Sequence, residues 1–346
     1  MSARQIDVTV IIPVFNQSAT IRRTLEGFKK QAGAAVNAEL ILVDDRSSDN
    51  SVELIRHFVD AQCILLVNQV NSGPAFTRNR GLDAARGRII VFSDGDIVPD
   101  AGFLKAHMDF HAAYPGDEYA ALGNVVHPLD IKLTPLQLLG NAVDKWNEKQ
   151  CAHHQPCSGL DLRTGNFSLK KKFLGTDRFN QELFPRMGFE DTELGYRLSA
   201  RGMKILFNAQ ALSYHYHFRE PGEYLTKVVS YGEALARWTK NCPPAMAAEL
   251  NEKYNSMYDP SAWISKRNMN EFLRRVCIND LTVPFVKGLA GILGPVNQRL
   301  SAYFYNKLFK YLLLKGYRAE LAREDRQVAS VVKVKRSTLN DLRVVL

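Results

Sequence analysis

The sequence predicts an α/β fold built on a doubly wound, mostly parallel β-sheet. Apolar runs of strand length alternate with segments of helical spacing over residues 8–93, as expected for parallel strands joined by crossover helices. Acidic residues follow two of these runs, as Asp44-Asp45 and as Asp94-Gly95-Asp96. Ligands of doubly wound sheets bind beyond the carboxyl ends of the strands. We therefore expect both acidic groups to line one crevice.

Each element of this half has its own local signal. Short unbroken runs of β-branched and other apolar residues indicate strands that are covered on both faces. The strands expected from such runs are Val8–Val14, Glu39–Val43, Cys63–Val67 and Arg88–Ser93. The helices expected between them are one that carries Ile21, Leu25 and Phe28 at helical spacing, Ser51–Val59, and Pro74–Ala85, which begins with a proline.

The remainder of the chain has weaker periodicity. One clear helix, Thr192–Ala200, lies among loops and short strands between about residues 115 and 225, and the later segments are mostly helical. The expected domains are residues 1–222, with halves of about 1–114 and 115–222, and a basic, mostly helical C-terminal extension of residues 223–346.

The net charge of +9 is concentrated at the C-terminal end. Residues 301–346 hold ten lysines and arginines against four acids. Such a segment suggests a phosphate-bearing partner, either an anionic lipid surface or a nucleic acid, unless it is a solvated helical face. No run reaches about 18 uninterrupted apolar residues, so no membrane span is expected; the closest approach, Leu281–Val296, is broken by Lys287.

Composition places the chain among globular proteins, because 46% hydrophobic and 10% aromatic residues exclude a disordered or fibrous class. The five cysteines are an odd number and no cleavable leader precedes the first strand, so reduced thiols in a cytoplasmic protein are expected. Cys151 and Cys157 flank His153 and His154, but this spacing matches no common structural zinc site.

The acidic group Asp94-Gly95-Asp96 is the first that can carry chemistry. Two carboxylates at a sheet edge repel one another and lose solvation, so a compensating cation is expected. Hard divalent ions such as Mg²⁺ and Mn²⁺ take oxygen ligands and bridge them to phosphate oxygens. Alone, the pair would be explained by a solvated turn. Its position at the end of the fourth strand favours a metal site.

A second group begins the helix near residue 190. Asp191 follows Glu190 at a helix start, where an acid can cap the helix and favours the helix dipole. The same carboxylate can take the proton of an attacking hydroxyl as a general base. The residue alone leaves both roles open, and the tandem acids together with the upstream acidic pair favour the base.

A third group lies on the expected strand Ala211–His217. Alternation places His215 and His217 on one face of that strand. A neutral imidazole can complete a carboxylate-rich metal site. Two structural histidines in an aromatic strand are the alternative.

Taken together, these segments resemble glycosyltransferase family 2, whose members have the GT-A fold. The matching segments are VTVIIPVFNQ, ELILVDDRSSDNS, NSGPAFTRNRGLDAARGRIIVFSDGDIVPD, TGNFSLKK, GFEDTELGYRLSARG and ALSYHYH. They follow the family order over roughly residues 8–217, about 60% of the chain. The resemblance implies an inverting transfer of a sugar, of hexosyl or N-acetylhexosaminyl type, from a nucleoside diphosphate sugar to a hydroxyl.

On the donor side, the resemblance implies a binding set for the nucleotide sugar. The set comprises Pro13, Phe15, Asp45, Arg78, Asp94 and Gly95. Asp45 would bond the nucleobase, Pro13 and Phe15 would line the pocket around it, and Arg78 would lie near the diphosphate. Arg46 stands where the family commonly has a small residue, so the nucleobase stays open, with a UDP-sugar favoured.

The resemblance also implies a metal set and an acceptor side. Asp94 and Asp96 would hold the diphosphate through Mn²⁺ or Mg²⁺, with His215 as the third protein ligand and His217 as its alternative. The acceptor-side residues would be Asp191 as the base, Glu190 as a helper or acceptor contact, and Gly165 and Asn166 in a loop where a glycine permits close backbone approach.

Two other function classes fit less well. A binding module that has lost catalysis would lack Asp94, Asp96 or Asp191, and all three are present. A nucleotidyltransferase would carry an early glycine-rich loop, and residues 11–23 contain no glycine. The expected partners are therefore a nucleoside diphosphate sugar and a glycan or lipid-linked acceptor of polysaccharide biosynthesis, and not nucleic acid. Peripheral contact with an anionic membrane at its cytosolic face, and a homodimer, stay open.

Overall fold

The chain divides into two compact units, each described here by itself. The first is Met1–Leu133 with Gly140–Phe218, and the second is Thr134–Leu139 with Arg219–Leu346. The computed structural model describes residues 5–31, 36–128, 130–131, 152–216, 221–244, 246–250 and 279–343, without the side chains of residues 221–223, 299 and 324–343.

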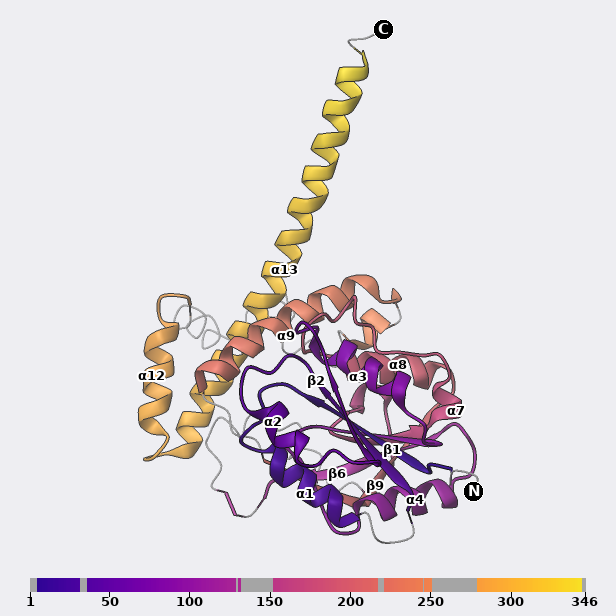
Figure 1. Cartoon of the computed structure of the whole chain (residues 1–346). Coiled ribbons are helices and arrows are strands. Elements are labelled where there is room, and N and C mark those ends of the chain that lie inside the picture. Colours follow the sequence, from indigo (N-terminus) through magenta and orange to yellow (C-terminus); the bar gives the residue numbers. More distant parts are fainter. Residues whose placement is uncertain are drawn as a thin grey trace. The chain divides into compact units, whose positions relative to one another are not determined.

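Nine strands in the described residues of the first unit form one sheet (Figure 1). They are β1 (Val8–Val14), β2 (Ala38–Asp44), β3 (Cys63–Val67), β4 (Ile89–Ser93), β5 (Ile97–Pro99), β6 (Tyr119–Val126), β7 (Pro156–Cys157), β8 (Asn166–Lys170) and β9 (Lys204–His215). Their order is β3-β2-β1-β4-β8-β6-β9-β5, with β7 paired to β9. Strands β1 to β4 form parallel pairs, β8 lies antiparallel to β4, and β6 lies parallel to β9. The expected doubly wound, mostly parallel sheet is confirmed.

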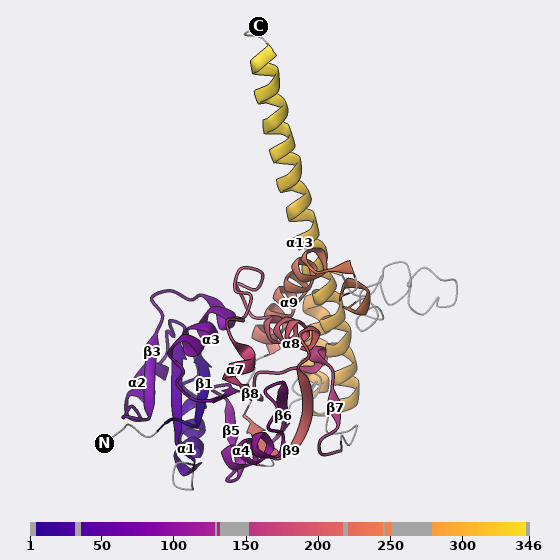
Figure 2. The same cartoon turned by 90° about the vertical axis from the view of Figure 1, so that its right-hand side faces the viewer.

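Helices cover both faces of this sheet (Figure 2). They are α1 (Ile21–Gln31), α2 (Ser51–Arg56), α3 (Gly73–Ala84), α4 (Phe103–Ala113), α7 (Lys171–Leu174) and α8 (Glu190–Ala200), with a 3₁₀ turn at Gly159–Asp161. Side chains of α1, α2 and α4 pack with Val10 and Ile12 of β1, whereas those of α3 and α8 share a cluster with Ile11. Alternate residues of β1 therefore enter two separate cores, which explains its unbroken apolar run.

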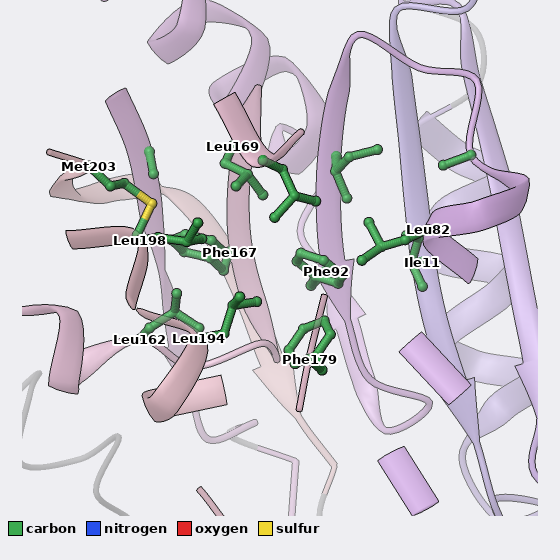
Figure 3. Packing of buried hydrophobic residues seen from close by; sticks show 14 of the residues in the cluster. Ile11, Leu82, Phe92, Leu162, Phe167, Leu169, Phe179, Leu194, Leu198 and Met203 are labelled. Carbon is green, nitrogen blue, oxygen red and sulfur yellow. The ribbon is translucent and has the colours of Figure 1, made fainter. Parts of the chain in front are cut away.

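The core around Phe92 fixes the strand that leads into the acidic turn. Phe92 of β4 is fully buried and meets the ring of Phe179 edge to face, with 5.4 Å between ring centroids (Figure 3). Phe167 of the neighbouring strand β8 is its register partner and is equally buried. Each such side chain contributes about 1.5–3 kcal/mol by burial. The end of β4, and with it Asp94, is therefore held by a rigid part of the molecule.

The sequence placed the N-terminal elements correctly to within a few residues. The third helix runs over Gly73–Ala84 rather than Pro74–Ala85, and the helix expected to end at Val59 ends at Arg56. Strand β9 begins at Lys204, well before the expected Ala211, and ends at His215. His217 and Cys151 lie outside the described residues.

The second unit is helical in its described part. It contains α9 (Pro221–Asn241), α12 (Val283–Leu293) and α13 (Gln298–Arg343). Gly232 of α9 and Gly316 of α13 face backbone so closely that an added Cβ would meet the carbonyl oxygens of Leu313 and Val229 at 2.0 Å. These two glycines let α9 and α13 pack at short range. Among the described helices, none combines the length and the apolar character that crossing a membrane requires.

Candidate active site

The acidic turn between β4 and β5 is anchored by two threonines at the start of helix α1. Thr20 and Thr24 lie one helical turn apart, and both hydroxyls donate to the backbone carbonyl of Gly95, at 3.1 and 3.0 Å. The amide of Ile97 closes the turn on the carbonyl of Asp94 at 3.1 Å. With the backbone anchored on both sides, the carboxylates of Asp94 and Asp96 are left to project from a fixed position.

Asp96 faces the histidine that the resemblance pairs with it. Strand β5 lies antiparallel to the end of β9, and Tyr216 donates its amide to the Asp96 carbonyl at 2.8 Å. This pairing brings Asp96 Oδ2 to 3.3 Å from His215 Nε2. Two ligands of one octahedral ion, each about 2.1 Å from it, are about 3 Å apart. The Asp96–His215 pair therefore fits a shared divalent cation.

Asp94, predicted with Asp96 to hold the metal, also bonds to Arg78. Its Oδ1 accepts a hydrogen bond from Arg78 at 2.8 Å, which leaves Oδ2 to face the site. Within the part of the chain that the structure describes, no group of three or more His, Cys, Asp or Glu side chains is arranged to hold a metal. The set of Asp94, Asp96 and His215 therefore stays a prediction, with diphosphate oxygens needed to complete the coordination.

Arg78 joins the two halves of the site. It is 5% exposed, and its guanidinium donates to Asp94 at 2.8 Å and to Glu190 Oε1 at 3.0 Å. Burial raises the pKa of Glu190, as does the neighbouring Asp191, while Arg78 opposes the shift. Burial also raises the pKa of the Asp94 carboxyl, again against the effect of Arg78. The Nε of Arg78 is also buried and has no hydrogen-bond acceptor among the described residues.

Removing Arg78 should therefore destabilise the protein strongly. We expect Arg78→Met to lower the free energy of unfolding by about 3–5 kcal/mol, because Asp94 and Glu190 would lose their buried counter-charge. Arg88→Met is the matched control, since Arg88 pairs with Asp7 at the surface and such pairs contribute about 0–1 kcal/mol. Chemical denaturation of both variants measures the difference. An equal loss of unfolding free energy in the two variants would mean that the buried ion pairs of Arg78 do not stabilise this site.

The start of helix α8 positions the two acids at residues 190 and 191. Gly188 has φ 145° and Phe189 has φ 66°, a left-handed conformation that is uncommon for a non-glycine residue. This tight turn directs Glu190 inward, where its Oε2 accepts the amide of Gly188 at 2.8 Å and its Oε1 binds Arg78. Both oxygens of Glu190 are thus engaged, which suits a positioning role better than proton transfer.

Asp191 keeps one oxygen available. Its Oδ1 accepts the amide of Thr192 at 2.7 Å and the Thr192 hydroxyl at 3.2 Å. Its Oδ2 has only a long contact of 3.5 Å with the amide of Thr164. Asp191 is half-buried in the first turn of α8, whose N-cap is Phe189, so it is not the capping residue. The geometry leaves Oδ2 able to accept a proton.

Gly165 lies between this oxygen and the acidic turn. It follows Thr164, and a Cβ added to it would lie 3.4 Å from Asp94 Oδ2. The same short backbone segment therefore borders both Asp191 and Asp94. Its lack of a side chain leaves Asp94 Oδ2 uncrowded on this side, and the acceptor-side role expected for Gly165 stays a prediction.

Asn166 is not in a loop, contrary to the expectation from the sequence. It begins strand β8 and is fully buried. Its amide nitrogen donates to the Ala211 carbonyl at 2.8 Å, and its Oδ1 lies 3.0 Å from His107 Nε2. Burial lowers the pKa of His107 to about 4. Asn166 thus ties neighbouring strands of the sheet together, and the acceptor-side role expected for it stays a prediction.

Asp45 organises the loop that leads into helix α3. Its Oδ1 accepts from Asn68 Nδ2 at 2.7 Å and from the Ser72 amide at 2.9 Å, and its Oδ2 accepts the Gly73 amide at 2.8 Å. Three bonds occupy most of the accepting capacity of the carboxylate. The structure thus shows that Asp45 fixes the conformation of this loop. Its role in bonding the nucleobase stays a prediction.

The loops after β1 and β2 interlock beside it. Asn16, with φ 52°, accepts the Ser48 amide at 2.8 Å and donates its own amide to Ser47 Oγ at 2.9 Å. Phe15 is left 48% exposed at this edge, next to the partly buried Pro13, and Arg46 is exposed. A flat exposed ring on a rigid loop is suited to contact with a nucleobase.

Gly73 should tolerate no side chain. It has φ 85°, and a Cβ would lie 2.5 Å from the carbonyl oxygen of Pro185. We expect Gly73→Ala to destabilise the protein by at least about 1–2 kcal/mol, the cost of the left-handed backbone alone. Gly102→Ala should be nearly neutral, because φ is −95° there and nothing lies within 4 Å of the new Cβ. Thermal unfolding of both variants checks this, and a neutral Gly73→Ala would contradict it.

Several supporting residues were not found from the sequence. They are Thr20 and Thr24 beneath Gly95, Asn68 beside Asp45, Thr192 beside Asp191, and the ion pair between Arg78 and Glu190. The two threonines are four residues apart, and this spacing alone predicts that they lie on the same side of a helix. The pair between Arg78 and Glu190 joins distant parts of the sequence and offered none.

Comparison with known proteins shows which family the N-terminal part of the chain resembles. Residues 9–153 match the sequence profile of the family described as Glycosyl transferase family 2. The chain carries a family 2 glycosyltransferase domain. Asp45, Arg78, Asp94 and Asp96 lie inside the matched region of this domain, whereas Asp191 and His215 lie beyond it.

Curated relatives of this glycosyltransferase domain include enzymes of polysaccharide synthesis. Chondroitin synthase of Escherichia coli is 25% identical over 238 residues, which are 60% of this chain and 34% of that protein. The E. coli UDP-Glc:alpha-D-GlcNAc-diphosphoundecaprenol beta-1,3-glucosyltransferase WfgD is 39% identical over 98 residues, 28% of this chain and 38% of that protein. Across the curated relatives, the match spans 26% to 54% of their own length.

A solved structure shares the fold over most of the chain. The mannosyltransferase PcManGT from Pyrobaculum calidifontis, in complex with GDP-Man and Mn²⁺, has a TM-score of 0.60 at 16% sequence identity, covering 92% of this chain and 88% of that one. The fold is that of the GT-A glycosyltransferases, as the sequence motifs implied.

Proposed function

We propose that the protein is an inverting glycosyltransferase. It transfers a sugar from a nucleoside diphosphate sugar to a hydroxyl of a glycan or lipid-linked acceptor. The observation that carries this proposal is the position of the segment Thr164-Gly165: the Thr164 amide lies 3.5 Å from Asp191 Oδ2, and a Cβ on Gly165 would lie 3.4 Å from Asp94 Oδ2. A base on one side and a cation-binding turn on the other are what an in-line displacement at a sugar carbon requires.

Asp191 acts as the general base. The acceptor hydroxyl donates its proton to Oδ2 while its oxygen attacks the anomeric carbon. Thr192 holds the other oxygen through its amide and hydroxyl, at 2.7 and 3.2 Å, so the carboxylate keeps one orientation during the step. Glu190 and Arg78 form the buried support beneath it. One displacement inverts the anomeric centre, so an α-linked donor gives a β-linked product.

The acidic turn receives the leaving diphosphate. When bound, Mn²⁺ or Mg²⁺ would be held by Asp96 and His215, with Asp94 as the third protein ligand, and would neutralise the charge of the leaving group. Arg78 supports the same end of the site, because its guanidinium holds the Asp94 carboxylate at 2.8 Å. The structural relative PcManGT was solved as a complex with GDP-Man and Mn²⁺, which supports this arrangement.

The donor is a UDP-sugar by preference, with Phe15 and Pro13 beside the base and Asp45 supporting the loop around it. A hexosyl or N-acetylhexosaminyl group is transferred. The names of the relatives, a chondroitin synthase and an enzyme acting on a diphosphoundecaprenol-linked sugar, favour a growing polysaccharide or a lipid-linked glycan as acceptor. We place the reaction at the cytosolic face of a membrane.

A panel of nucleotide sugars tests the proposal without knowledge of the acceptor. The full chain is incubated with each UDP- and GDP-sugar and Mn²⁺, and release of nucleoside diphosphate is measured. One or a few donors should be hydrolysed slowly, and Asp96→Ala should abolish the signal. A protein that binds a nucleotide sugar in calorimetry and never releases the diphosphate, with any acceptor glycan added, would instead be a non-catalytic binding module.

A further inference from the structure

One face of helix α12 and the segments beside it expose large apolar side chains. Val286 and Ala290 of α12 are buried in the cluster that they form with Tyr305 and Leu308 of α13. Other apolar residues nearby in the sequence point to solvent. They are Leu281 at 91% exposure, Phe285 at 73%, Ile292 at 73%, Val296 at 83%, Leu300 at 41% and Tyr303 at 43%. We call this set the α12 apolar surface.

The charge around this surface has a single sign. Residues 281–319 contain no aspartate or glutamate. They contain six basic residues, Lys287, Arg299, Lys307, Lys310, Lys315 and Arg318. The nearest preceding acid, Asp280, already binds Lys315 at 2.6 Å and Tyr311 at 3.0 Å. The segment therefore combines exposed apolar side chains with a net positive charge.

We propose that the α12 apolar surface docks the protein peripherally onto a membrane rich in anionic lipids. Phe285, Ile292 and Val296 enter the boundary between headgroups and acyl chains, while Lys287 and the basic residues of α13 meet lipid phosphates. This inference names a partner for the proposed transferase, yet it does not depend on catalysis, because lipid binding is measured without any substrate.

The same features argue against other occupants of this surface. A symmetric dimer would bring the surface against its own copy, and the net positive charges of the two copies would repel one another. Nucleic acid would use the lysines and arginines and could stack on Phe285 and Tyr303, but it would leave the aliphatic side chains of Leu281, Ile292 and Val296 exposed to water. A lipid interface uses the apolar and the basic side chains together.

Vesicle flotation tests the proposal with the full chain. Protein is mixed at low salt with vesicles of phosphatidylcholine alone or of phosphatidylcholine and phosphatidylglycerol in equal amounts. The wild type should float with the anionic vesicles, and high salt should weaken this binding. The double variant Phe285→Asp/Ile292→Asp should reduce the ratio of bound to free protein on the order of tenfold or more, because two charges replace the inserting side chains.

The matched control places the same changes on the first unit. Val59 and Val70 belong to the first unit and are 46% and 66% exposed, so Val59→Asp/Val70→Asp adds the same charges outside the α12 apolar surface and should float like the wild type. All four side chains are exposed, so both variants should unfold at the wild-type temperature. The proposal is overturned if the wild type stays at the bottom with anionic vesicles, or if the control loses as much binding as the α12 variant. It is also overturned if light scattering finds a wild-type dimer that only the α12 variant dissociates and that does not float.

Discussion

Replacing Asp191 by asparagine should lower the rate of sugar transfer by about 10²–10⁴-fold, the usual contribution of a general base. The amide can still accept from Thr192, whose amide and hydroxyl hold Oδ1 at 2.7 and 3.2 Å, so helix α8 should keep its start. The amide cannot take a proton at neutral pH. The nucleoside diphosphate should bind as it does to the wild type, because we propose that Asp191 acts on the acceptor and does not contact the diphosphate.

The measurement is the turnover rate with saturating donor and acceptor, alongside calorimetry of diphosphate binding. Asp83→Asn is the matched control, because Asp83 pairs with Arg178 at the surface and is 65% exposed. That control should keep full activity. If Asp191→Asn retains more than about a tenth of the wild-type rate, another group takes the proton.

Replacing Asp96 by alanine should weaken binding of the nucleoside diphosphate in the presence of Mn²⁺ by at least about 10–100-fold. Asp96 Oδ2 and His215 Nε2 are 3.3 Å apart and would bind the metal together. Removing the carboxylate would leave the metal only the imidazole of this pair. Chelation of the metal by EDTA should inactivate the wild type, and added Mn²⁺ or Mg²⁺ should restore it.

Calorimetry with and without Mn²⁺ distinguishes diphosphate binding through the metal from direct binding to the Asp96 side chain. Without metal, wild type and Asp96→Ala should bind the diphosphate equally weakly. Asp109→Ala serves as the control, since Asp109 is 56% exposed and pairs only with Lys105 within its own helix turn. Equal diphosphate affinity of the wild type in the two conditions would mean that the acidic turn does not bind through a cation.

The N-terminal half could be predicted from the sequence because its signals are local. The run from Val8 to Val14 is apolar throughout, since its alternate residues enter two different cores. The carboxyl ends of β2 and β4 then place Asp45 and Asp94 at one edge by topology alone. The order of the motifs added the prediction of which acids bind the donor and which act on the acceptor.

The second half could not be predicted in the same way, because long-range contacts decide it. The sequence predicts a loop at Asn166. In the structure Asn166 begins β8, is buried, and forms hydrogen bonds with Ala211 and His107. The 3.0 Å contact between Arg78 and Glu190 joins α3 to α8 and carries no periodic signal. The left-handed Phe189 is likewise set by the fold around it, since its residue type does not favour that backbone.

The pairing of β5 with β9 has a consequence for how the protein matures. Ile97 pairs with His215, so Asp96 acquires its imidazole neighbour only after about 120 further residues have been synthesised. A nascent chain that has completed α4 already carries both acids of the turn, but it lacks His215, Glu190 and Asp191. Donor affinity should therefore arise late in biosynthesis, and a nascent chain cannot trap cellular nucleotide sugars before it is able to use them.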